Sequence, residues 1–254
     1  MKSHEEQEVE DHVWLEGAIS VAAALQGGSR KVAAVYLRQE VKYRSKPRFR
    51  RLERLAASSG VPVHRVDEHF FQQKASGKSH GGVLAEAGPR EMLPLEKLCS
   101  AAEHGFVVML DGIEDPFNFG QSVRALYAAG VDGIVLRPRN WMTATAVVTR
   151  ASAGATELVP MAIVSEVEEA VSFFRGKGYQ VACTGEKGSL TLFEADLRGP
   201  LFLLLGGEKR GITRSFLSQA DLVLRIPYGR EYDYALGTAM SAAVVGFEVL
   251  RQRS

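Results

Sequence analysis

The sequence predicts an α/β protein in which a smaller amino-terminal α/β domain precedes a domain built on a parallel sheet. Its 254 residues, 46% hydrophobic and 24% charged, are typical of an ordinary folded chain. A chain of this length forms one large domain or two modest ones. In the second half, continuous apolar stretches alternate with helical patterns, as in parallel sheets covered by helices on both faces. The segment Ala87–Pro94 carries Gly88, Pro89 and Pro94, the composition of a linker between the two parts.

The amino-terminal domain is expected over residues 13–88 as alternating helices and strands. A helix is expected from Trp14 to Leu25, because apolar residues recur there at helical spacing until Gly27 and Gly28 end the run. The remaining expectations are strands at 32–37, 61–66 and 83–86, a helix at 49–57 and a polar, glycine-rich loop at 72–82. Residues 1–12 are polar and acidic, so they are expected to form a flexible tail.

A linker is expected at 89–103, with a short helix at 95–103, and the second domain at 104–254. Strands are expected in this domain where apolar residues run without interruption, at 106–110, 133–136, 179–184, 201–205 and 222–225, with helical stretches between them. The last helix, 237–251, is rich in alanine and glycine. It therefore suits tight packing against another element, including a partner subunit.

Composition excludes several classes of protein. With 31 Lys and Arg against 30 Asp and Glu, the net charge is +1, so attraction to a polyanion requires uneven placement of charge. The first twenty residues hold six acidic groups and no apolar core, which excludes a signal peptide, and no apolar run reaches the roughly 18 residues that span a bilayer. Cys99 and Cys183 lie far apart, as is typical of two reduced thiols rather than a disulfide or a metal site. We expect a cytoplasmic protein with no metal and no membrane partner.

Basic residues are concentrated in one segment of the first domain. Between Arg30 and Arg54 there are ten Lys and Arg against two Glu, with three aromatic residues interspersed. Cations bind phosphates and aromatic rings stack on unpaired bases, so this segment is a candidate RNA-binding surface. The alternative is a solvated helix and loop. The candidate RNA-binding residues are Arg30, Lys31, Lys42, Arg44, Lys46, Arg48, Arg50 and Arg51.

The first loop that could carry chemistry, Leu110–Arg124, leaves a predicted strand and enters a helix after Pro116. Loops of this kind, at the carboxyl edge of a parallel sheet, bind ligands in many α/β proteins. Asn118 and Arg124 are its candidate functional residues. The alternatives are that Asn118 caps the helix and that Arg124 is a surface arginine.

A second loop, Leu203–Thr213, resembles a phosphate-binding loop but lacks its lysine, because Ile212 stands at that position. Glu208 would also repel phosphates, so nucleotide hydrolysis is disfavoured. No Gly-x-Gly-x-x-Gly follows a predicted strand, which removes the main support for a dinucleotide cofactor. What remains is a glycine turn whose backbone can approach a small uncharged or cationic ligand. A third loop, Leu224–Leu236, leads into the last helix and is generic by itself.

Taken together, the three loops resemble the SpoU/TrmH family of RNA ribose 2′-O-methyltransferases, part of the SPOUT superfamily. The matching text is Asn118-x-Gly120-x-x-x-Arg124, Gly206-x-Glu208-x-x-Gly211 and Ile226-Pro227 before the last helix. Ala151–Ala155 is also similar to a segment of the family. Val13–Gly17 and Ser79–Val83 are similar to the amino-terminal RNA-binding domain that is common in it, which adds His80 to the RNA-binding candidates.

The resemblance implies a catalytic domain with a carboxy-terminal trefoil knot, a homodimer, and S-adenosylmethionine as the cofactor. It also implies transfer of a methyl group to a ribose 2′-hydroxyl of ribosomal or transfer RNA. Asn118 and Arg124 fall on its active-site positions. The residues implied to hold the cofactor are Thr184, Leu205, Gly206, Gly207, Glu208, Gly211, Ile226, Pro227, Tyr228 and Leu236.

The third motif departs from the family pattern. Where the family has Ser-Leu-Asn, this chain has Ala235-Leu236-Gly237, and the preceding loop is one residue longer. A later serine of the motif is Ala239. Tyr232, Asp233, Tyr234 and Thr238 are the polar residues that could compensate. The alternative function is a catalytically silent RNA-binding homologue that retains the fold and the dimer.

Overall fold

The structure is a computed structural model. It describes residues 12–40, 46–99, 104–138, 145–185, 190–207, 214–217 and 219–254. The chain divides into two compact units. The first contains Met1–Glu91 and Thr143–Leu158, and the second contains Met92–Met142 and Val159–Ser254. The tail predicted at 1–12 lies outside the described residues, except for His12.

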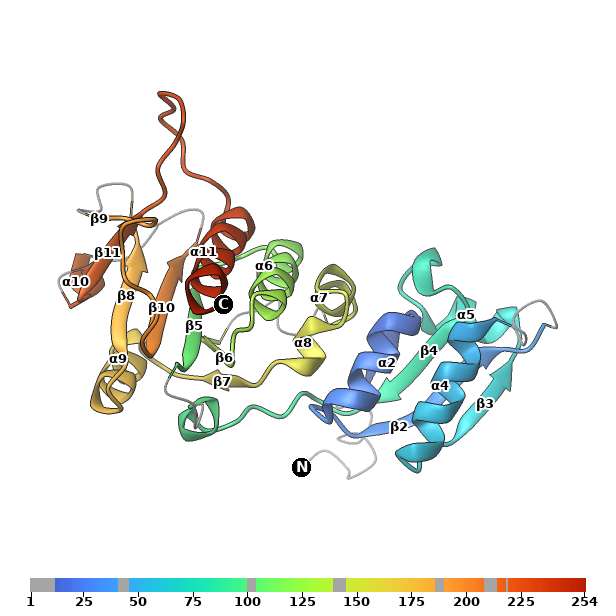
Figure 1. Cartoon of the computed structure of the whole chain (residues 1–254). Coiled ribbons are helices and arrows are strands. Elements are labelled where there is room, and N and C mark those ends of the chain that lie inside the picture. Colours follow the sequence, from blue (N-terminus) through green and yellow to red (C-terminus); the bar gives the residue numbers. More distant parts are fainter. Residues whose placement is uncertain are drawn as a thin grey trace, which may run out of the picture. The chain divides into compact units, whose positions relative to one another are not determined.

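The first unit is built on a four-stranded mixed sheet, in the order β1-β4-β2-β3 (Figure 1). Strand β4 pairs antiparallel with β1 and with β2, and β2 pairs parallel with β3. The strands are β1 (Val13–Glu16), β2 (Val32–Arg38), β3 (Val63–Val66) and β4 (Val83–Ala87). The helices are α2 (Ala18–Gly27), α4 (Pro47–Ser58), α5 (Glu68–Lys74), α7 (Thr145–Ala151) and α8 (Ala155–Leu158), with a 3-10 turn η1 (Lys78–His80). Alternate residues of the strands, such as Val35 and Leu37, form one buried cluster with Phe49 and Leu52 of α4.

Two predictions for this unit are wrong in part. Trp14 lies in strand β1, and helix α2 begins only at Ala18, because Gly17 between them adopts a left-handed φ of 89°. The loop predicted from residue 72 begins later, since α5 extends to Lys74. The side chain of Asp67 caps α5 by accepting a hydrogen bond from the Phe70 amide, 3.0 Å away.

The second unit is built on a seven-stranded sheet whose described pairs are all parallel, in the order β7-β6-β5-β10-β8-β11-β9. This confirms the predicted parallel sheet. The strands are β5 (Phe106–Asp111), β6 (Gly133–Leu136), β7 (Met161–Ile163), β8 (Gln180–Thr184), β9 (Leu190–Thr191), β10 (Leu201–Gly206) and β11 (Leu222–Arg225). The helices are α6 (Pro116–Ala128), α9 (Val167–Gly176), α10 (Arg214–Leu217) and α11 (Thr238–Arg253), with a 3-10 turn η2 (Leu95–Leu98). The short helix predicted at 95–103 is this turn, and residues 100–103 lie outside the described part.

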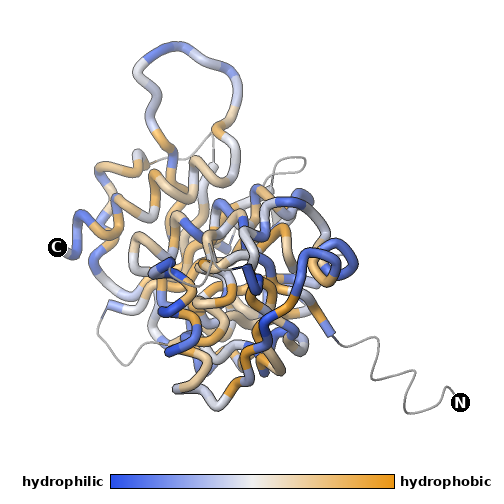
Figure 2. Tube along the Cα trace, turned by 90° about the vertical axis from the view of Figure 1, so that its right-hand side faces the viewer, coloured by the Kyte–Doolittle hydropathy of each residue, from blue (hydrophilic) through white to orange (hydrophobic). Residues whose placement is uncertain are grey.

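The core of the second unit lies between the sheet and the helices. Phe174 of α9 stacks on Phe202 of β10 with ring centroids 4.6 Å apart. The central strand β10 is buried over Leu201–Leu205, whereas the loop between β11 and α11, at the top of Figure 2, is largely hydrophilic. Both cysteines are free thiols, as predicted, and burial raises the pKa of Cys183 to about 11. Because the strands are parallel, their carboxyl ends meet at one edge of the sheet, which is where the candidate loops begin.

Candidate functional site at the carboxyl edge of the parallel sheet

The ends of neighbouring strands bring the predicted loops together. Gly206, at the end of β10, lies opposite Asp111 at the end of β5. Thr184, at the end of β8, lies opposite Leu224 of β11, two residues before Ile226. Four cofactor candidates, Thr184, Leu205, Gly206 and Ile226, therefore lie at the ends of three adjacent strands.

The turn after β10 packs against the turn after β5. A Cβ atom on Gly207 would lie 1.9 Å from the carbonyl oxygen of Gly112, so this position accepts only glycine at the observed spacing. Gly112 itself has a φ of 75°, a conformation that residues with a side chain rarely adopt. The two glycines thus allow the backbones of the first and second candidate loops to touch. The rest of the second loop, including Glu208 and Gly211, lies outside the described residues.

An ion pair that the sequence analysis missed anchors the same edge. The Nε and Nη2 atoms of Arg137 donate to the two carboxylate oxygens of Asp111 at 2.8 and 2.7 Å. This bidentate hydrogen bonding, with the attraction of the carboxylate, raises the pKa of Arg137. The pair ties the end of β5 to the segment after β6. An aspartate directly after an apolar strand was the available signal, but nothing in the sequence indicated its partner.

Helix α6 presents the two candidate catalytic residues. Its capping residue is Asp115, whose carboxylate accepts from the amide of Asn118 at 2.7 Å, so the alternative that Asn118 caps the helix is wrong. Asn118 lies half-buried in the first turn. Arg124 is exposed further along the helix, and no hydrogen bond or ion pair joins its guanidinium to another described residue.

The third loop returns the chain to the same edge. At the start of α11, the hydroxyl of Thr238 donates to the carbonyl oxygen of Gly206 at 3.3 Å. Helix α11 then packs along α6, and the absence of a side chain at Gly246 permits close approach to Leu126 and Ala129. The start of α11 and the end of β10 therefore meet, beside the turn after β5 that leads into α6.

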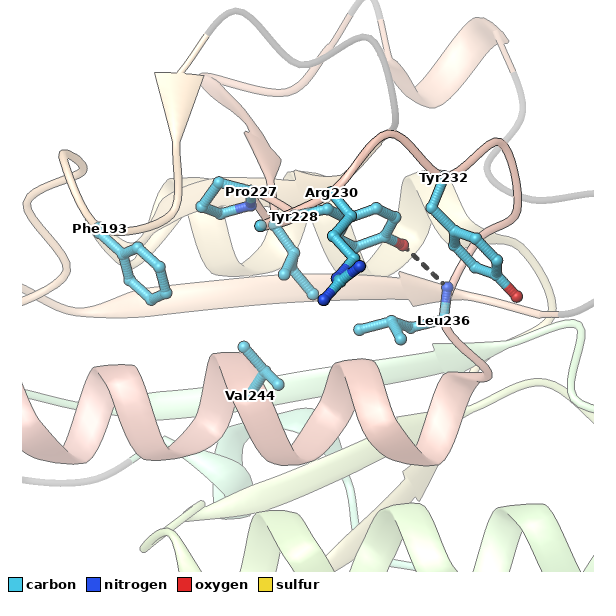
Figure 3. A pocket seen from close by; sticks show the side chains of 9 residues that line it. Phe193, Pro227, Tyr228, Arg230, Tyr232, Leu236 and Val244 are labelled. Carbon is cyan, nitrogen blue, oxygen red and sulfur yellow. Dashed lines mark hydrogen bonds between the residues drawn. The ribbon is translucent and has the colours of Figure 1, made fainter.

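A groove of about 610 Å³ opens between the third loop and α11 (Figure 3). Four of the cofactor candidates line it: Ile226, Pro227, Tyr228 and Leu236. The Tyr228 hydroxyl accepts from the Leu236 amide at 3.0 Å, which closes the loop on itself. The groove is also lined by Phe193, Gly229, Arg230, Tyr232 and Val244. Phe193 and Val244 were not predicted, because only the tertiary fold brings them to the loop.

Seven of the candidate RNA-binding residues of the first unit lie in the described part of the chain, and they fall into two groups. Five are exposed: Lys31, Lys46, Arg48, Arg50 and Arg51. Lys42 and Arg44 lie outside the described residues. The side chains of Arg30 and His80 are instead buried. The Arg30 guanidinium donates to buried Glu157 at 2.8 Å, and the His80 ring stacks on Phe71 at 4.7 Å. Burial lowers the pKa of His80, with a further contribution from nearby Arg38.

The part of the chain that the structure describes holds no candidate metal site and no candidate membrane-spanning helix. The described residues contain no group of three or more His, Cys, Asp and Glu that could hold a metal ion. Within the same ranges, none of the helices has the length and apolar character needed to cross a membrane.

Comparison with known families identifies the chain. Residues 105–247 match the SpoU rRNA methylase family, and residues 14–93 match the RNA 2′-O ribose methyltransferase substrate-binding family. The chain belongs to the SpoU rRNA methylase family. The predicted resemblance is thereby confirmed.

Among relatives, the chain is 30% identical over 241 residues to the 23S rRNA (guanosine-2′-O-)-methyltransferase RlmB of Pseudomonas putida, covering 93% of this chain and 95% of the relative. It is 29% identical over 240 residues to the protein of the same name from Shewanella oneidensis, covering 93% and 96%.

Solved structures share the fold. The SpoU methyltransferase AviRb from Streptomyces viridochromogenes, in complex with AdoMet, superposes with a TM-score of 0.79 at 19% identity, covering 99% of this chain and 94% of that one. The AdoMet-bound rRNA methyltransferase from Sinorhizobium meliloti superposes with a TM-score of 0.77 at 24% identity, covering 98% and 90%. These similarities confirm the predicted α/β architecture.

Proposed function

We propose that this chain transfers a methyl group from S-adenosylmethionine to a ribose 2′-hydroxyl of ribosomal RNA. The observation that carries the proposal is that Gly206, Thr238 and the turn after β5 that leads into α6 meet at one edge of the sheet, beside a groove lined by the third loop. Family membership gives this arrangement its chemistry. The named relatives act on 23S rRNA, and two of the similar structures contain AdoMet.

The residues around the groove fit S-adenosylmethionine. The lining of the groove is largely apolar, as an adenine ring requires, and includes Ile226, Pro227, Leu236 and Val244. The volume of the groove, about 610 Å³, lies in the range of small-molecule sites. The absence of a side chain at Gly207 lets the turn after β10 pack directly on the turn after β5, next to Gly206 at the strand end. Thr184 and Leu205 complete the proposed site from the strand ends, with Glu208 and Gly211 from the remainder of the loop. When bound, S-adenosylmethionine supplies a methyl group on a positively charged sulfur, which is already strongly electrophilic.

The protein must then orient the ribose hydroxyl and assist the loss of its proton. A guanidinium is essentially never deprotonated in proteins, so Arg124 is not the base. We assign it instead to the phosphate beside the target ribose, where its fork of donors also stabilises the oxyanion that develops. Asn118, in the first turn of the same helix, orients the substrate, and the proton passes to a neighbouring group or to solvent.

The exposed basic residues of the first unit form the proposed RNA surface. Lys46, Arg48, Arg50 and Arg51 lie in or next to α4, and Lys31 precedes β2. Cations exposed in this way can contact phosphates. Lys42 and Arg44 extend the proposed surface in sequence. Arg30 and His80 contribute from inside the unit, by holding its structure.

The proposed assembly is a homodimer with a knotted carboxy-terminal region, acting in the cytoplasm where ribosomal RNA is found. Met240, Phe247 and Leu250 lie at spacings of seven and three residues on one face of α11, and all three are exposed. Phe117 and Tyr127 are exposed on the neighbouring helix α6. Exposed apolar residues on two helices that pack together favour a second copy of this chain as the partner. After β11 the chain returns to the end of β10, where Thr238 is hydrogen-bonded to Gly206. This return supports the proposed knot.

Replacing Arg124 by Lys tests the assignment of its guanidinium. Lysine keeps the charge but not the bidentate fork, so we expect kcat for methyl transfer into 23S rRNA to fall about 10²-fold. Tritiated methyl transfer measures the rate, and titration calorimetry with S-adenosylmethionine serves as the control, since donor affinity should be unchanged. Unaltered turnover would contradict the assignment. If the wild-type protein binds RNA but not S-adenosylmethionine, the result would instead favour the alternative function, a catalytically silent RNA-binding homologue.

A further inference from the structure

Three tyrosines form a ladder on the loop between β11 and α11. Tyr228, Tyr232 and Tyr234 are 40%, 61% and 71% exposed. Their rings nevertheless lie next to one another, with centroids 6.2 Å apart between Tyr228 and Tyr232 and 5.5 Å apart between Tyr232 and Tyr234. Large rings gathered on a surface mark an interaction site more often than rings exposed singly.

The ladder starts at the groove and leads away from it. Tyr228 and Tyr232 line the groove, whereas Tyr234 does not (Figure 3). The loop that carries them is held at both ends. The Tyr228 hydroxyl accepts from the Leu236 amide, and Thr238 is bonded to the end of β10. The rings are therefore held beside the proposed donor site.

We propose that Tyr232 and Tyr234 form a stacking surface for an unpaired RNA base next to the nucleotide that is methylated. The inference rests on the proposed function and adds a substrate-positioning site to it. Aromatic side chains stack on unpaired bases regardless of sequence, and stacking of a neighbouring base would hold the target ribose over the groove.

The charges on the loop favour a base over other occupants. Arg230 is exposed and lines the groove, where it can meet a phosphate, but Glu231 and Asp233 flank Tyr232. These carboxylates oppose a run of phosphates, so the surface suits a single base better than a length of backbone. They also oppose burial against another protein, because interface cores are depleted of charged residues.

The decisive comparison is between two double variants. In the alanine pair, Tyr232→Ala is combined with Tyr234→Ala, and in the phenylalanine pair, Tyr232→Phe is combined with Tyr234→Phe. Stacking contributes about 1–3 kcal/mol per base, so removing both rings should raise KM for unmodified 23S rRNA transcript roughly 5- to 150-fold. The phenylalanine pair keeps the rings and should retain the wild-type KM. The dissociation constant for S-adenosylmethionine, measured by calorimetry in all three proteins, should change much less than the KM for RNA, because Tyr234 does not line the groove.

Three results would overturn the proposal. An unchanged KM in the alanine pair would show that the rings do not touch RNA. Equal weakening of donor binding would show that the loop covers the cofactor instead. A phenylalanine pair as defective as the alanine pair would assign the effect to the hydroxyls.

Photo-crosslinking separates failure of this inference from failure of the proposed function. Irradiation of the wild-type protein with the 23S transcript at ultraviolet wavelengths should attach nucleotides to the tryptic peptide Glu231–Arg251, which contains both tyrosines. The attachment should disappear in the alanine pair, whether or not methyl transfer occurs. If the crosslink forms but no methyl group is transferred, the proposed enzymatic function is rejected and the stacking surface is not. Absence of the crosslink in the wild-type protein would reject the stacking surface.

Discussion

At the scale of single residues, the site depends on positions where a side chain would be too large. Gly207 meets the backbone of Gly112, and this contact joins the turns after β10 and β5. A methyl group there would clash with a carbonyl oxygen rather than with the end of a flexible side chain, so the backbone itself would have to move. The cost of such overpacking is about 1–3 kcal/mol.

The substitution Gly207→Ala should therefore weaken donor binding and lower the melting temperature together. Titration calorimetry with S-adenosylmethionine and thermal unfolding by circular dichroism measure the two effects. Gly176→Ala is the matched control, because a Cβ atom at the end of α9 has no neighbour within 4 Å. Wild-type affinity in the Gly207 variant would mean that the turn is not part of the donor site.

At the scale of elements, a short helix is fastened to the first unit by buried charge. Glu157 of α8 is 1% exposed and accepts hydrogen bonds from Ser29 and Arg30, both at 2.8 Å, while Arg90 lies 3.8 Å away. Burial lowers the pKa of Arg90 to about 10, and Glu157 opposes this shift, so the arginine stays charged near neutral pH. One carboxylate thus balances two buried guanidinium groups that come from distant parts of the sequence.

Replacing Glu157 by Ala should destabilise the first unit strongly, by about 3–5 kcal/mol, because it removes the carboxylate that balances those two buried charges. Urea unfolding followed by circular dichroism measures the change. The control is Asp196→Ala, which removes an ion pair with Arg198 that is exposed to solvent and should leave the unfolding curve unchanged. Equal effects from the two substitutions would refute the distinction between buried and exposed pairs.

Elements with a strong local pattern could be predicted from the sequence, and those that depend on a distant partner could not. Apolar runs such as residues 201–205 predicted the central strands, because a strand buried on both faces has no polar positions. Trp14 was misassigned because its spacing to Ala18 fits a helix, and only the backbone of Gly17 separates strand from helix. The burial of Arg30 had no local signal, since its partner lies 127 residues away in sequence.

At the scale of the whole molecule, the proposed dimer would place the exposed apolar face of α11 against a second copy of the chain. A self-complementary interface of this kind concentrates its binding energy in a few large apolar residues. Phe247 is 49% exposed at the centre of the stripe between Met240 and Leu250, which makes it the residue whose change should matter most.

The substitution Phe247→Glu should convert the dimer to a monomer at micromolar concentration, because two carboxylates would face one another across a desolvated surface. A loss of about 2 kcal/mol or more, the usual threshold for a central interface residue, corresponds to a roughly 30-fold weaker dimer. Sedimentation velocity across a dilution series measures the association constant.

Ile19→Glu, which places the same charge at an exposed apolar position of α2, is the control and should leave the association constant unchanged. A wild-type protein that sediments as a monomer, or a Phe247 variant that remains dimeric, would remove α11 from the interface. If Arg124 must act with a partner subunit, the monomeric variant should also lose methyl transfer while keeping its affinity for S-adenosylmethionine.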